Sequence, residues 1–404
     1  MAKNDTYDIA IVGGGLVGAS LAVALRELPY RVVVIDAYPF GAEEQPAYDD
    51  RAIALSYGSS QIFRGMGVWD QVKTGLTTID GIHVSDKGHL GATRLTAKQE
   101  NVAALGYLVE SRILGKHLHQ ALSDSAHDYL APVKVTAAHT TEKGVLLQLD
   151  DNKTIHSKLL VAADGGGSTI RQLMGVGIDK HDYEQSAVIA NITPQKPHNN
   201  IAYERFTAKG PIALLPMTDN RCSLVWTFPK AEVEAGMALS DTEFLKALQC
   251  AFGYRLGRFL KIGQRSVFPL ALIKSQQIVT NHTVFIGNAA QALHPVAGQG
   301  LNLGLRDIAQ LVETLSKQSC TLGGTKQLED YQKARQTDRE TVMRYTNSLI
   351  SLFSNDSILL GHARASGLML FDRIAPLRRL LSRQSMGANA SHTRLARGLP
   401  PILN

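Results

Sequence analysis

The stretch Tyr7-Asp8-Ile9-Ala10-Ile11-Val12-Gly13-Gly14-Gly15-Leu16-Val17-Gly18 decides the fold of the first part of the chain. Tyr7 to Val12 is short and apolar, which is typical of a buried strand. Leu16 to Leu28 has helical spacing, and the β-branched run from Arg31 to Ala37 again indicates a buried strand. A strand, a helix and a second strand in this order predict a βαβ unit.

Gly13, Gly15 and Gly18 form a GxGxxG pattern at the junction of this strand and helix. Gly13 permits a tight turn, Gly15 lets the backbone approach a pyrophosphate, and Gly18 lets the helix and strand pack closely. The pattern predicts a dinucleotide site because a strand precedes it and a helix follows it. It does not by itself separate FAD from NAD, and a glycine-rich turn without a ligand stays open as the alternative.

The start of the helix and the end of the second strand complete the predicted dinucleotide site. Leu16 and Val17 lie in the first turn, where unpaired backbone N–H groups and the helix dipole attract phosphate. Asp36 ends the second strand and is placed to accept hydrogen bonds from an adenosine ribose.

Length and composition predict a globular protein of about two domains. The 404 residues can bury more than one core. With 44% hydrophobic and 19% charged residues, neither wholesale disorder nor a membrane bundle is implied. The formal charge of +6 is modest, and the sequence has no basic run with interleaved aromatic residues. We therefore expect no nucleic-acid partner.

The three cysteines, Cys222, Cys250 and Cys320, are widely spaced and form no CxxC pair. This argues against a disulfide framework and against a zinc site, and it favours a reducing compartment. We expect no metal site.

The apolar stretch Ile9–Leu28 resembles a secretory signal, with Ala22-Val23-Ala24 as a cleavage site. Acidic Asp5 and Asp8 and three consecutive glycines argue against that reading. A cytoplasmic protein is the better expectation.

Further strands and helices follow the first unit. The loose alternation between Thr78 and Leu95 indicates strands added to that unit. Leu108–Leu122 has helical spacing, and Val133–Leu149 reads as strands with a turn at Glu142-Lys143-Gly144. Leu159–Ala163 is typical of another buried strand.

A second domain is predicted from short strands separated by turn residues, as in an antiparallel sheet. They are Ser186–Ile192, Ile201–Phe206, Ile212–Met217 and Cys222–Phe228. The strand Thr283–Ile286 and the helix Leu301–Leu315 then return the chain to the first domain. We expect an FAD-binding domain of residues 1–180 with 275–345, a substrate domain of 181–274, and a helical segment and tail of 346–404.

Two later segments resemble a known family. Val161-Ala162-Ala163-Asp164-Gly165-Gly166-Gly167-Ser168-Thr169-Ile170-Arg171 is similar to the Asp-Gly segment of class A flavoprotein monooxygenases. Ile286–Ala290 and the HPxAGQGxNxGxxD run from His294 to Asp307 are similar to the second flavin segment of the ubiquinone-biosynthesis hydroxylases. Asp50–Leu55, Glu204–Met217 and Arg221–Trp226 are similar in particular to hydroxylases that act on 2-polyprenyl-6-methoxyphenol.

The resemblance implies an α/β fold of the p-hydroxybenzoate-hydroxylase type: a Rossmann-like FAD-binding domain, an inserted antiparallel sheet and a helical C-terminus. It also implies bound FAD with NAD(P)H as reductant. The backbone N–H groups of Gly300, Leu301 and Asn302 open a helix and would stabilise negative charge on reduced flavin. Asn302 and Gln299 would add side-chain donors, and the loop glycine Gly298 would let the flavin lie against backbone.

Several of these positions have a second reading. Asn288 stands where the family more often has an acid, and an amide can still accept from a ribityl hydroxyl. Asp164 either contacts cofactor or caps a helix that runs on from Ser168. Arg51 and Arg112 resemble flavin-contacting positions, but each is equally well explained as a solvated side chain.

His294 and Pro295 are the candidate catalytic residues. His294 is either a general base on a phenol or a packing residue, and packing is the favoured role because oxygen transfer by flavin does not require a histidine. Pro295 would stiffen the loop and contribute its carbonyl near the reactive face.

The region from Gly361 onward carries seven arginines and a single acid, Asp372. Apolar residues interleave with the arginines at helical spacing, which predicts a basic amphipathic helix. Such a helix is suited to the inner face of a membrane, to another ubiquinone-biosynthesis protein, or to the core of its own chain. Homo-oligomerisation also stays open.

The expected activity is hydroxylation of a polyprenylated phenol, 2-polyprenyl-6-methoxyphenol, to the 1,4-benzoquinol with O2 and NAD(P)H. A flavin-linked prenyl-lipid reductase or dehydrogenase would share the fold and need no oxygen. A prenyl-binding scaffold that has lost flavin is the non-catalytic alternative, and the intact glycine loop with Asp36 speaks against it.

Overall fold

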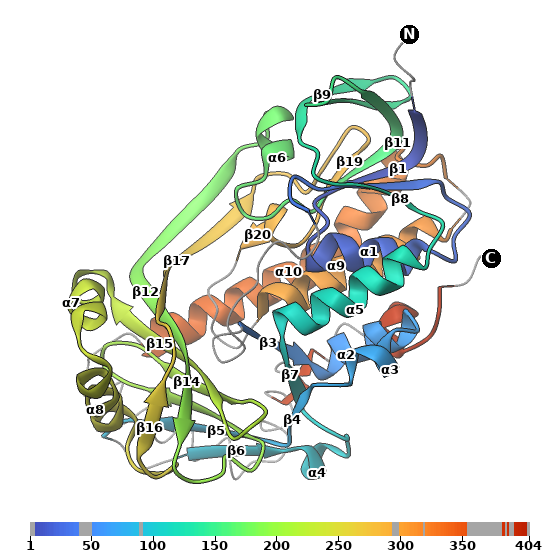
Figure 1. Cartoon of the computed structure of the whole chain (residues 1–404). Helices are drawn as coiled ribbons and strands as arrows, with labels where there is room; N and C mark the ends of the chain where they lie inside the picture. The colour runs from blue at the N-terminus through green and yellow to red at the C-terminus, as the bar shows by residue number, and fades with distance from the viewer. Residues whose placement is uncertain are drawn as a thin grey trace.

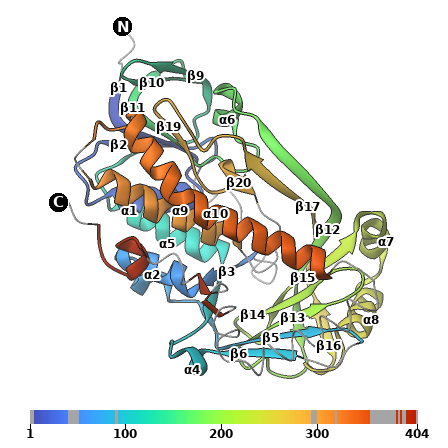
Figure 2. The same ribbon diagram turned by 180° about the vertical axis from the view of Figure 1, so that it is seen from behind.

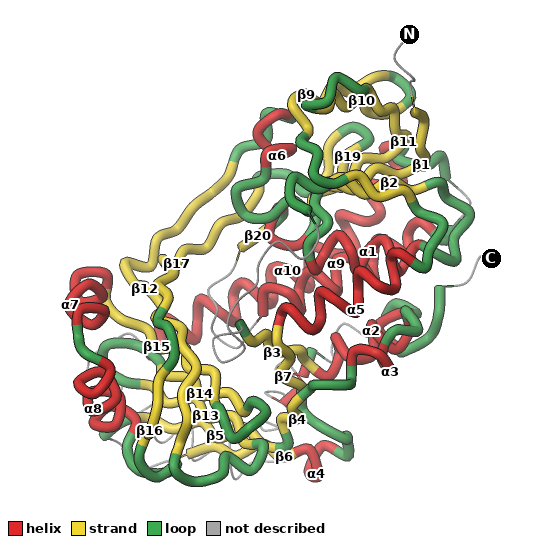
Figure 3. The backbone as a smooth tube through the Cα atoms, viewed as in Figure 1, coloured by secondary structure: helices red, strands yellow, loops and turns green. Residues whose placement is uncertain are grey.

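The computed structural model describes residues 5–39, 51–88, 92–292, 299–317, 320–353, 382–383, 386–387 and 392–401. Two large sheets organise the chain (Figures 1 and 3). The eight-stranded sheet lies at one end with most of the long helices beneath it, and the nine-stranded sheet forms the other end.

The first sheet has a parallel core in the order β19 (Thr283–Phe285), β11 (Thr154–Ala162), β1 (Asp5–Val12), β2 (Val32–Ile35) and β8 (Asp128–Leu130). The antiparallel strands β18 (Val279–Thr280), β10 (Gly144–Leu149) and β9 (Val135–Thr141) extend it. β1, the helix α1 (Leu16–Leu25) and β2 confirm the predicted βαβ unit, and β9 and β10 confirm the hairpin at Glu142–Gly144.

Four helices lie together beside this sheet: α1, α5 (Ser111–Ser123), α9 (Gln299–Leu315) and α10 (Thr325–Phe353) (Figures 1 and 2). The buried side chains of α1 and α9 join β1, β2, β11 and β19 in one hydrophobic core. This burial is what fixes the helices, because apolar area removed from water is the dominant favourable term in folding. α10 continues from there towards the nine-stranded sheet.

The second sheet follows the order β20 (Gln291–Ala292), β17 (Ser266–Ser275), β12 (Ile178–Pro194), β15 (Cys222–Pro229), β14 (Ile212–Pro216), β13 (Ile201–Phe206), β5 (Gly81–Asp86) and β6 (Ala92–Thr96). β16 (Phe259–Ile262) pairs with β12. The pairs β12–β15, β12–β17, β13–β14 and β14–β15 are antiparallel, which confirms the predicted antiparallel sheet. The strand β13 begins and ends at the predicted residues.

Two sequence predictions are wrong about strands. β5 and β6 do not extend the first unit, because β5 pairs in parallel with β13 of the nine-stranded sheet. Residues 108–110, predicted as the start of a helix, belong to the strand β7 (Gly106–Glu110), and α5 begins only at Ser111. β7 pairs with β3 (Ala52–Ser56) and β4 (Thr77–Ile79) in a small three-stranded sheet, so pairing overrides the local helical spacing.

The remaining elements cover the two halves. α2 (Tyr57–Gly65), α3 (Trp69–Val72) and α4 (Ala97–Glu100) follow the first segment, and α6 (Thr169–Leu173) follows β11. α7 (Val233–Ala238) and α8 (Asp241–Phe252), which the sequence analysis did not predict, cover one face of the nine-stranded sheet. The proposed domain limits at 181 and 274 fall inside β12 and β17, the two long strands that pair between the halves.

Candidate functional site

Four of the predicted site residues follow the carboxyl ends of parallel strands. Gly13 follows β1, Asp36 follows β2, Asp164 comes soon after β11, and Asn288 comes soon after β19. Backbone hydrogen bonds join these strand ends: the Gly13 N–H donates to Ile35 O at 2.8 Å. In open α/β sheets, ligands bind at this edge, so the topology gathers residues that lie far apart in the sequence.

The glycine loop is fixed by close contacts at two of its glycines. Gly13 has φ of +102°, and a Cβ there would lie 2.6 Å from the carbonyl oxygen of Ala163. A Cβ on Gly18 would lie 1.8 Å from the carbonyl oxygen of Gly13. Any larger residue would therefore push β1, α1 and β11 apart.

Gly15 differs because nothing in the described structure lies within 4 Å of the Cβ position. It is the N-cap of α1, where no side chain caps the helix and the first turn contains no acidic residue. The N–H groups of Leu16 and Val17 thus begin a helix that faces open space. An uncapped helix N-terminus attracts anions, so this geometry fits the pyrophosphate of a dinucleotide.

Asp36 sits beside the loop as predicted for a ribose contact. Its Oδ2 accepts a hydrogen bond from the Gly14 N–H at 2.5 Å, and its Oδ1 accepts one from the Tyr38 N–H at 2.9 Å. These bonds hold the carboxylate at the strand end. Lone pairs remain on both oxygens, so the side chain can still accept from a hydroxyl.

Tyr129 and His119 surround the same carboxylate and were not identified from the sequence. Burial and the negative charge of Asp36 raise the pKa of Tyr129 to about 12. His119 forms a hydrogen bond with the backbone of Gly14, and its ring meets the Tyr129 ring edge-on at 5.7 Å. Tyr129 reaches the site through the pairing of β8 with β2, and His119 reaches it from α5, which packs against α1. The sequence carries no local signal for either contact.

The hydrogen bonds of Asp164 match the second role predicted for it, that of a helix cap. Its Oδ1 accepts from the Ser168 Oγ at 2.5 Å, and its Oδ2 accepts from the Ile170 N–H at 3.0 Å. The carboxylate thus holds the start of α6. A contact between Asp164 and cofactor stays a prediction.

Arg51 and Arg112 come together where β3 and β7 pair. The Ser111 N–H donates to Arg51 O at 2.7 Å, which places both arginines at the start of α5. The Arg51 guanidinium lies 5.1 Å from the centroid of the Phe268 ring, and Arg112 lies 3.8 Å from Glu110. Arg51 is exposed, and its guanidinium contacts the nine-stranded sheet at Phe268. The flavin contacts of Arg51 and Arg112 stay predictions.

Asn288 and the N-terminus of α9 are adjacent. Asn288 is exposed in a short 3-10 helix, Gly287–Ala289, and its Oδ1 lies 3.8 Å from the Cβ position of Gly300. Gly300 and Leu301 open α9, and Gln299 is buried at its first residue. The exposed amide beside a helix start is compatible with a flavin whose ribityl chain and ring lie at this edge.

Asn302 has a structural role that the sequence analysis missed. Its Oδ1 accepts from the Ser56 N–H at 2.8 Å and from the Ser59 Oγ at 2.7 Å, and its Nδ2 donates to Ala54 O at 2.9 Å. The side chain is buried and ties α9 to β3 and α2. Its predicted side-chain donation to flavin stays a prediction. His294, Pro295, Gly298 and the basic tail helix lie outside the described residues.

A network of buried charged side chains holds the loop that carries Asn288. The Asp307 Oδ2 accepts from the Gly287 N–H and from the Gln291 Nε2, both at 3.0 Å, and its Oδ1 lies 2.8 Å from Arg335. Burial alone would lower the pKa of Arg335, but Asp307 and Asp338 outweigh it and raise that pKa. Asp307 ends the HPxAGQGxNxGxxD run, and its arginine partner comes from α10.

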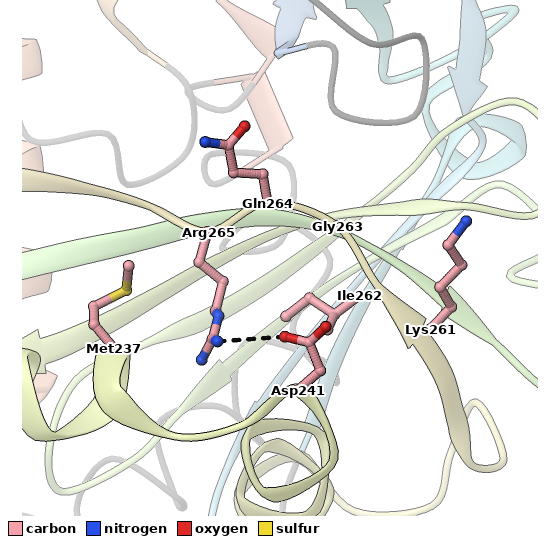
Figure 4. A pocket seen from close by; sticks show the side chains of 7 residues that line it. All are labelled: Met237, Asp241, Lys261, Ile262, Gly263, Gln264 and Arg265. Atoms are coloured by element: carbon pink, nitrogen blue, oxygen red, sulfur yellow. Dashed lines mark hydrogen bonds and ion pairs between the residues drawn. The ribbon is translucent and has the colours of Figure 1, made fainter.

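A hollow on the nine-stranded sheet lies apart from this edge (Figure 4). In it, Arg265 pairs with Asp241 at 3.3 Å, and the other lining residues are Met237, Lys261, Ile262, Gly263 and Gln264. None of the predicted site residues lines it. We do not assign it to the dinucleotide site.

Comparisons with known proteins agree with this geometry. A family model described as "FAD binding domain" matches residues 6–346. Ubiquinone hydroxylase UbiL of Rhodospirillum rubrum is 36% identical over 97% of this chain and 93% of its own. The 3-demethoxyubiquinol 3-hydroxylase of Escherichia coli is 30% identical over 95% of this chain and 99% of its own.

A solved structure supports the fold alone. The p-nitrophenol 4-monooxygenase PnpA from Pseudomonas putida superposes with a TM-score of 0.79 at 16% identity, covering 96% of this chain and 99% of its own. This confirms the predicted p-hydroxybenzoate-hydroxylase type of fold.

Fold, strand-end site and family match define an FAD-dependent aromatic hydroxylase that uses NAD(P)H as its reductant. Within that class, the chain belongs to the family of FAD-dependent hydroxylases of ubiquinone biosynthesis. Among the described residues, no helix combines the length and apolar character needed to cross a bilayer.

Proposed function

We propose that this enzyme hydroxylates the ring of a polyprenylated phenol in ubiquinone biosynthesis, with 2-polyprenyl-6-methoxyphenol as substrate and the 1,4-benzoquinol as product. The balanced reaction consumes the phenol, O2, NAD(P)H and one proton, and it yields the quinol, NAD(P)⁺ and water. Bound FAD supplies the redox chemistry, and the protein supplies binding, orientation and exclusion of water.

The observation that carries this proposal is the near full-length similarity to two ubiquinone hydroxylases, 36% and 30% identical. Those relatives do not fix the ring position. The assignment to the para position rests on the segments Glu204–Met217 and Arg221–Trp226, which resemble hydroxylases of the methoxyphenol.

The described residues have distinct proposed duties towards FAD. Gly15, Leu16 and Val17 face the pyrophosphate, and Asp36 accepts from the adenosine ribose. Asn288 contacts the ribityl chain, and the backbone N–H groups of Gly300 to Asn302 stabilise negative charge on the reduced ring. Four more proposed contacts with FAD come from Arg51, Arg112, Asp164 and Gln299. Next to the flavin ring we place His294, Pro295 and Gly298.

Attachment to the inner face of the membrane through the basic tail is a further part of the proposal, because the prenyl chain of the substrate resides in lipid. The charged residues from 361 onward give this segment seven arginines against one acid. Clusters of arginine next to apolar residues are attracted to anionic lipid surfaces.

The test is aerobic turnover of a short-chain 2-prenyl-6-methoxyphenol by the FAD-loaded protein with NAD(P)H under ¹⁸O2. We expect a para-quinol that carries one labelled oxygen. Labelled product at another ring position would overturn the substrate assignment alone. An unlabelled product would favour the reductase or dehydrogenase alternative, and a purified protein that binds no FAD would favour the non-catalytic scaffold.

A further inference from the structure

A row of side chains crosses the nine-stranded sheet, and it contains a single ionisable group. Register places Glu204 of β13 opposite Val84 of β5 and Ala213 of β14. The row continues from Ala213 to Val225 of β15, from Val225 to Ile189 of β12, and on to Ser266 of β17. Every member, Glu204 included, is half-buried. The row is therefore an accessible, mostly apolar strip with one carboxylate.

This strip lies on the face turned towards the flavin-binding half. Alternate residues of a strand point to opposite faces, so Tyr203 lies on the other face from Glu204. Tyr203 packs against Phe252 of α8 with ring centroids 5.9 Å apart, which identifies its face as the one covered by α8. Phe268 shares the face of Glu204 through its pairing with Ala187, and it is Phe268 that Arg51 contacts from the β3 side.

The carboxylate of Glu204 has no hydrogen bond or ion pair with any residue in the described part of the chain. Burial alone raises its pKa to about 7, and no neighbouring charge contributes. A carboxylate among Val84, Ala213 and Val225 without a cation is costly, because removing a charge from water is unfavourable unless it is paired. Groups with a pKa perturbed in this way cluster at functional sites.

We propose that Glu204 contacts the phenolic hydroxyl of the substrate and accepts its proton. The inference rests on the proposed function and names a catalytic residue for it. In the step, the phenolic O–H bond breaks, the proton moves to a Glu204 oxygen, and one negative charge moves from the carboxylate to the phenolate. The extra electron density at the ortho and para carbons favours oxygen transfer to the ring, and general-base assistance of this kind contributes roughly 10²–10⁴-fold.

The apolar neighbours suit the rest of such a substrate. Val84, Ala213 and Val225 offer no polar group to a ring or to the first prenyl unit beside Glu204. A phenol is an apolar ring with one hydroxyl, so an apolar strip with one acceptor matches its chemistry.

The other ionisable groups near the strip are few. On β5, Asp86 shares the face of Val84 but is buried two residues further along. From the flavin-binding half, Tyr57 packs against the same small apolar cluster as Ile82. Arg51 meets the face at Phe268, which lies on β17 beyond β14, β15 and β12. None of these groups contributes to the raised pKa of Glu204. A titration near pH 7 in turnover is therefore assigned to Glu204 by its loss in Glu204→Gln.

The experiment compares wild type, Glu204→Gln, Glu204→Asp and the control Glu234→Gln, an exposed carboxylate on α7. Each FAD-loaded protein is given short-chain 2-prenyl-6-methoxyphenol and NAD(P)H from pH 5.5 to about 9, a range that brackets the expected titration. Labelled product and NAD(P)H consumption are measured separately. We expect wild-type kcat for product to rise through pH 7.

Glu204→Gln should lose product formation by about 100-fold or more and lose that pH dependence, while FAD content and NAD(P)H oxidation persist. Glu204→Asp should form more product than Glu204→Gln, and its kcat should again rise with pH. Glu234→Gln should match wild type in both respects. Wild-type pH dependence and rate in Glu204→Gln would overturn the inference and leave the proposed function intact. Absence of labelled product from wild type would instead overturn the proposed function. If Glu204→Gln lost FAD, Glu204→Asp would decide. A reduced rate that still rises with pH, at a midpoint different from that of wild type, would support the inference, and an unchanged rate and midpoint would overturn it.

Discussion

The backbone N–H of Gly287 donates to the carboxylate of Asp307 at 3.0 Å, so a buried charge on α9 holds the loop that presents Asn288. The same carboxylate pairs with Arg335, whose side chain is 4% exposed. The loop before the cofactor edge is thus anchored to α10 through a charge that has no access to water.

Replacing Asp307 by Ala should lower the free energy of unfolding by about 3–5 kcal/mol, because it leaves the guanidinium of Arg335 buried with half its compensation. It should also lower FAD content, since Gly287 loses its acceptor. Urea unfolding and the flavin absorbance of the purified protein measure the two effects. Asp338→Asn is the matched control, because Asp338 pairs with Arg335 and Arg306 but not with Gly287. It should be destabilising with FAD content unchanged, and equal FAD loss in both variants would contradict the anchoring role.

Gly15 and Gly115 provide a test of the pyrophosphate site. A Cβ on Gly15 meets nothing within 4 Å, and the residue has φ of −66°, so Gly15→Ala should cost about 1 kcal/mol or less as a changed N-cap. It should nevertheless weaken FAD binding tenfold or more, because the methyl group occupies the space expected for phosphate. Quenching of FAD fluorescence by the apoprotein gives the dissociation constant.

Gly115→Ala is the control within α5, where the added methyl group makes ordinary contact with Leu16 at 3.8 Å. It should keep wild-type FAD affinity and stabilise the helix by about 1 kcal/mol. Wild-type affinity in Gly15→Ala would rule out the assigned position of the pyrophosphate.

Arg221 and Glu110 connect the two halves of the molecule by an ion pair of 2.8 Å between side chains that are 9% and 12% exposed. Arg221 precedes β15 and Glu110 ends β7. Either Arg221→Met or Glu110→Gln should cost about 1–3 kcal/mol, because it removes a short charged hydrogen bond. The remaining charge keeps only a more distant ionic partner, Arg112 at 3.8 Å from Glu110 or Asp219 at 3.8 Å from Arg221. The double variant should cost clearly less than the sum, and a double-mutant cycle in urea measures the coupling. Additive losses would mean that the pair does not couple the halves.

Local patterns predicted the parts of the fold that depend on local physics. The glycine spacing at Gly13 to Gly18 and the acid Asp36 located the strand-end site, because turn geometry and helix dipoles act over a few residues. The start of α9 was predicted within two residues for the same reason.

Predictions that depended on pairing between distant segments were the ones that failed. Nothing within residues 81–96 shows that β5 will pair with β13, since the partner lies more than a hundred residues later. Likewise, nothing near Asn302 in the sequence shows that its side chain will meet Ser56 and Ser59, because these partners are known only once α9 lies on β3 and α2. Asp307 was read as the end of a motif because its role depends on Arg335, a residue of α10 with no sequence signal of its own.

Glu204 makes a prediction about stability that is independent of catalysis. Its pKa is about 7 in the folded protein and 4.5 ordinarily, so between these values the folded protein binds more protons than the unfolded chain. The free energy of unfolding contributed by Glu204 therefore falls as pH rises from 4.5 to 7. Glu204→Gln removes this penalty and should be more stable than wild type by about 1–3 kcal/mol at pH 8, with the difference vanishing near pH 4.

Urea unfolding of wild type and Glu204→Gln at the same pH values measures this difference in the free energy of unfolding. Subtracting one protein from the other cancels the contribution of every other carboxylate. The control Glu234→Gln should show no such difference at either pH, because Glu234 is exposed on α7. A wild type that is as stable as Glu204→Gln at pH 8 would mean that the carboxylate is solvated or paired. The case for Glu204 as the acceptor of the phenolic proton would then lose its physical basis, because a group at its ordinary pKa is a poor base for a phenol.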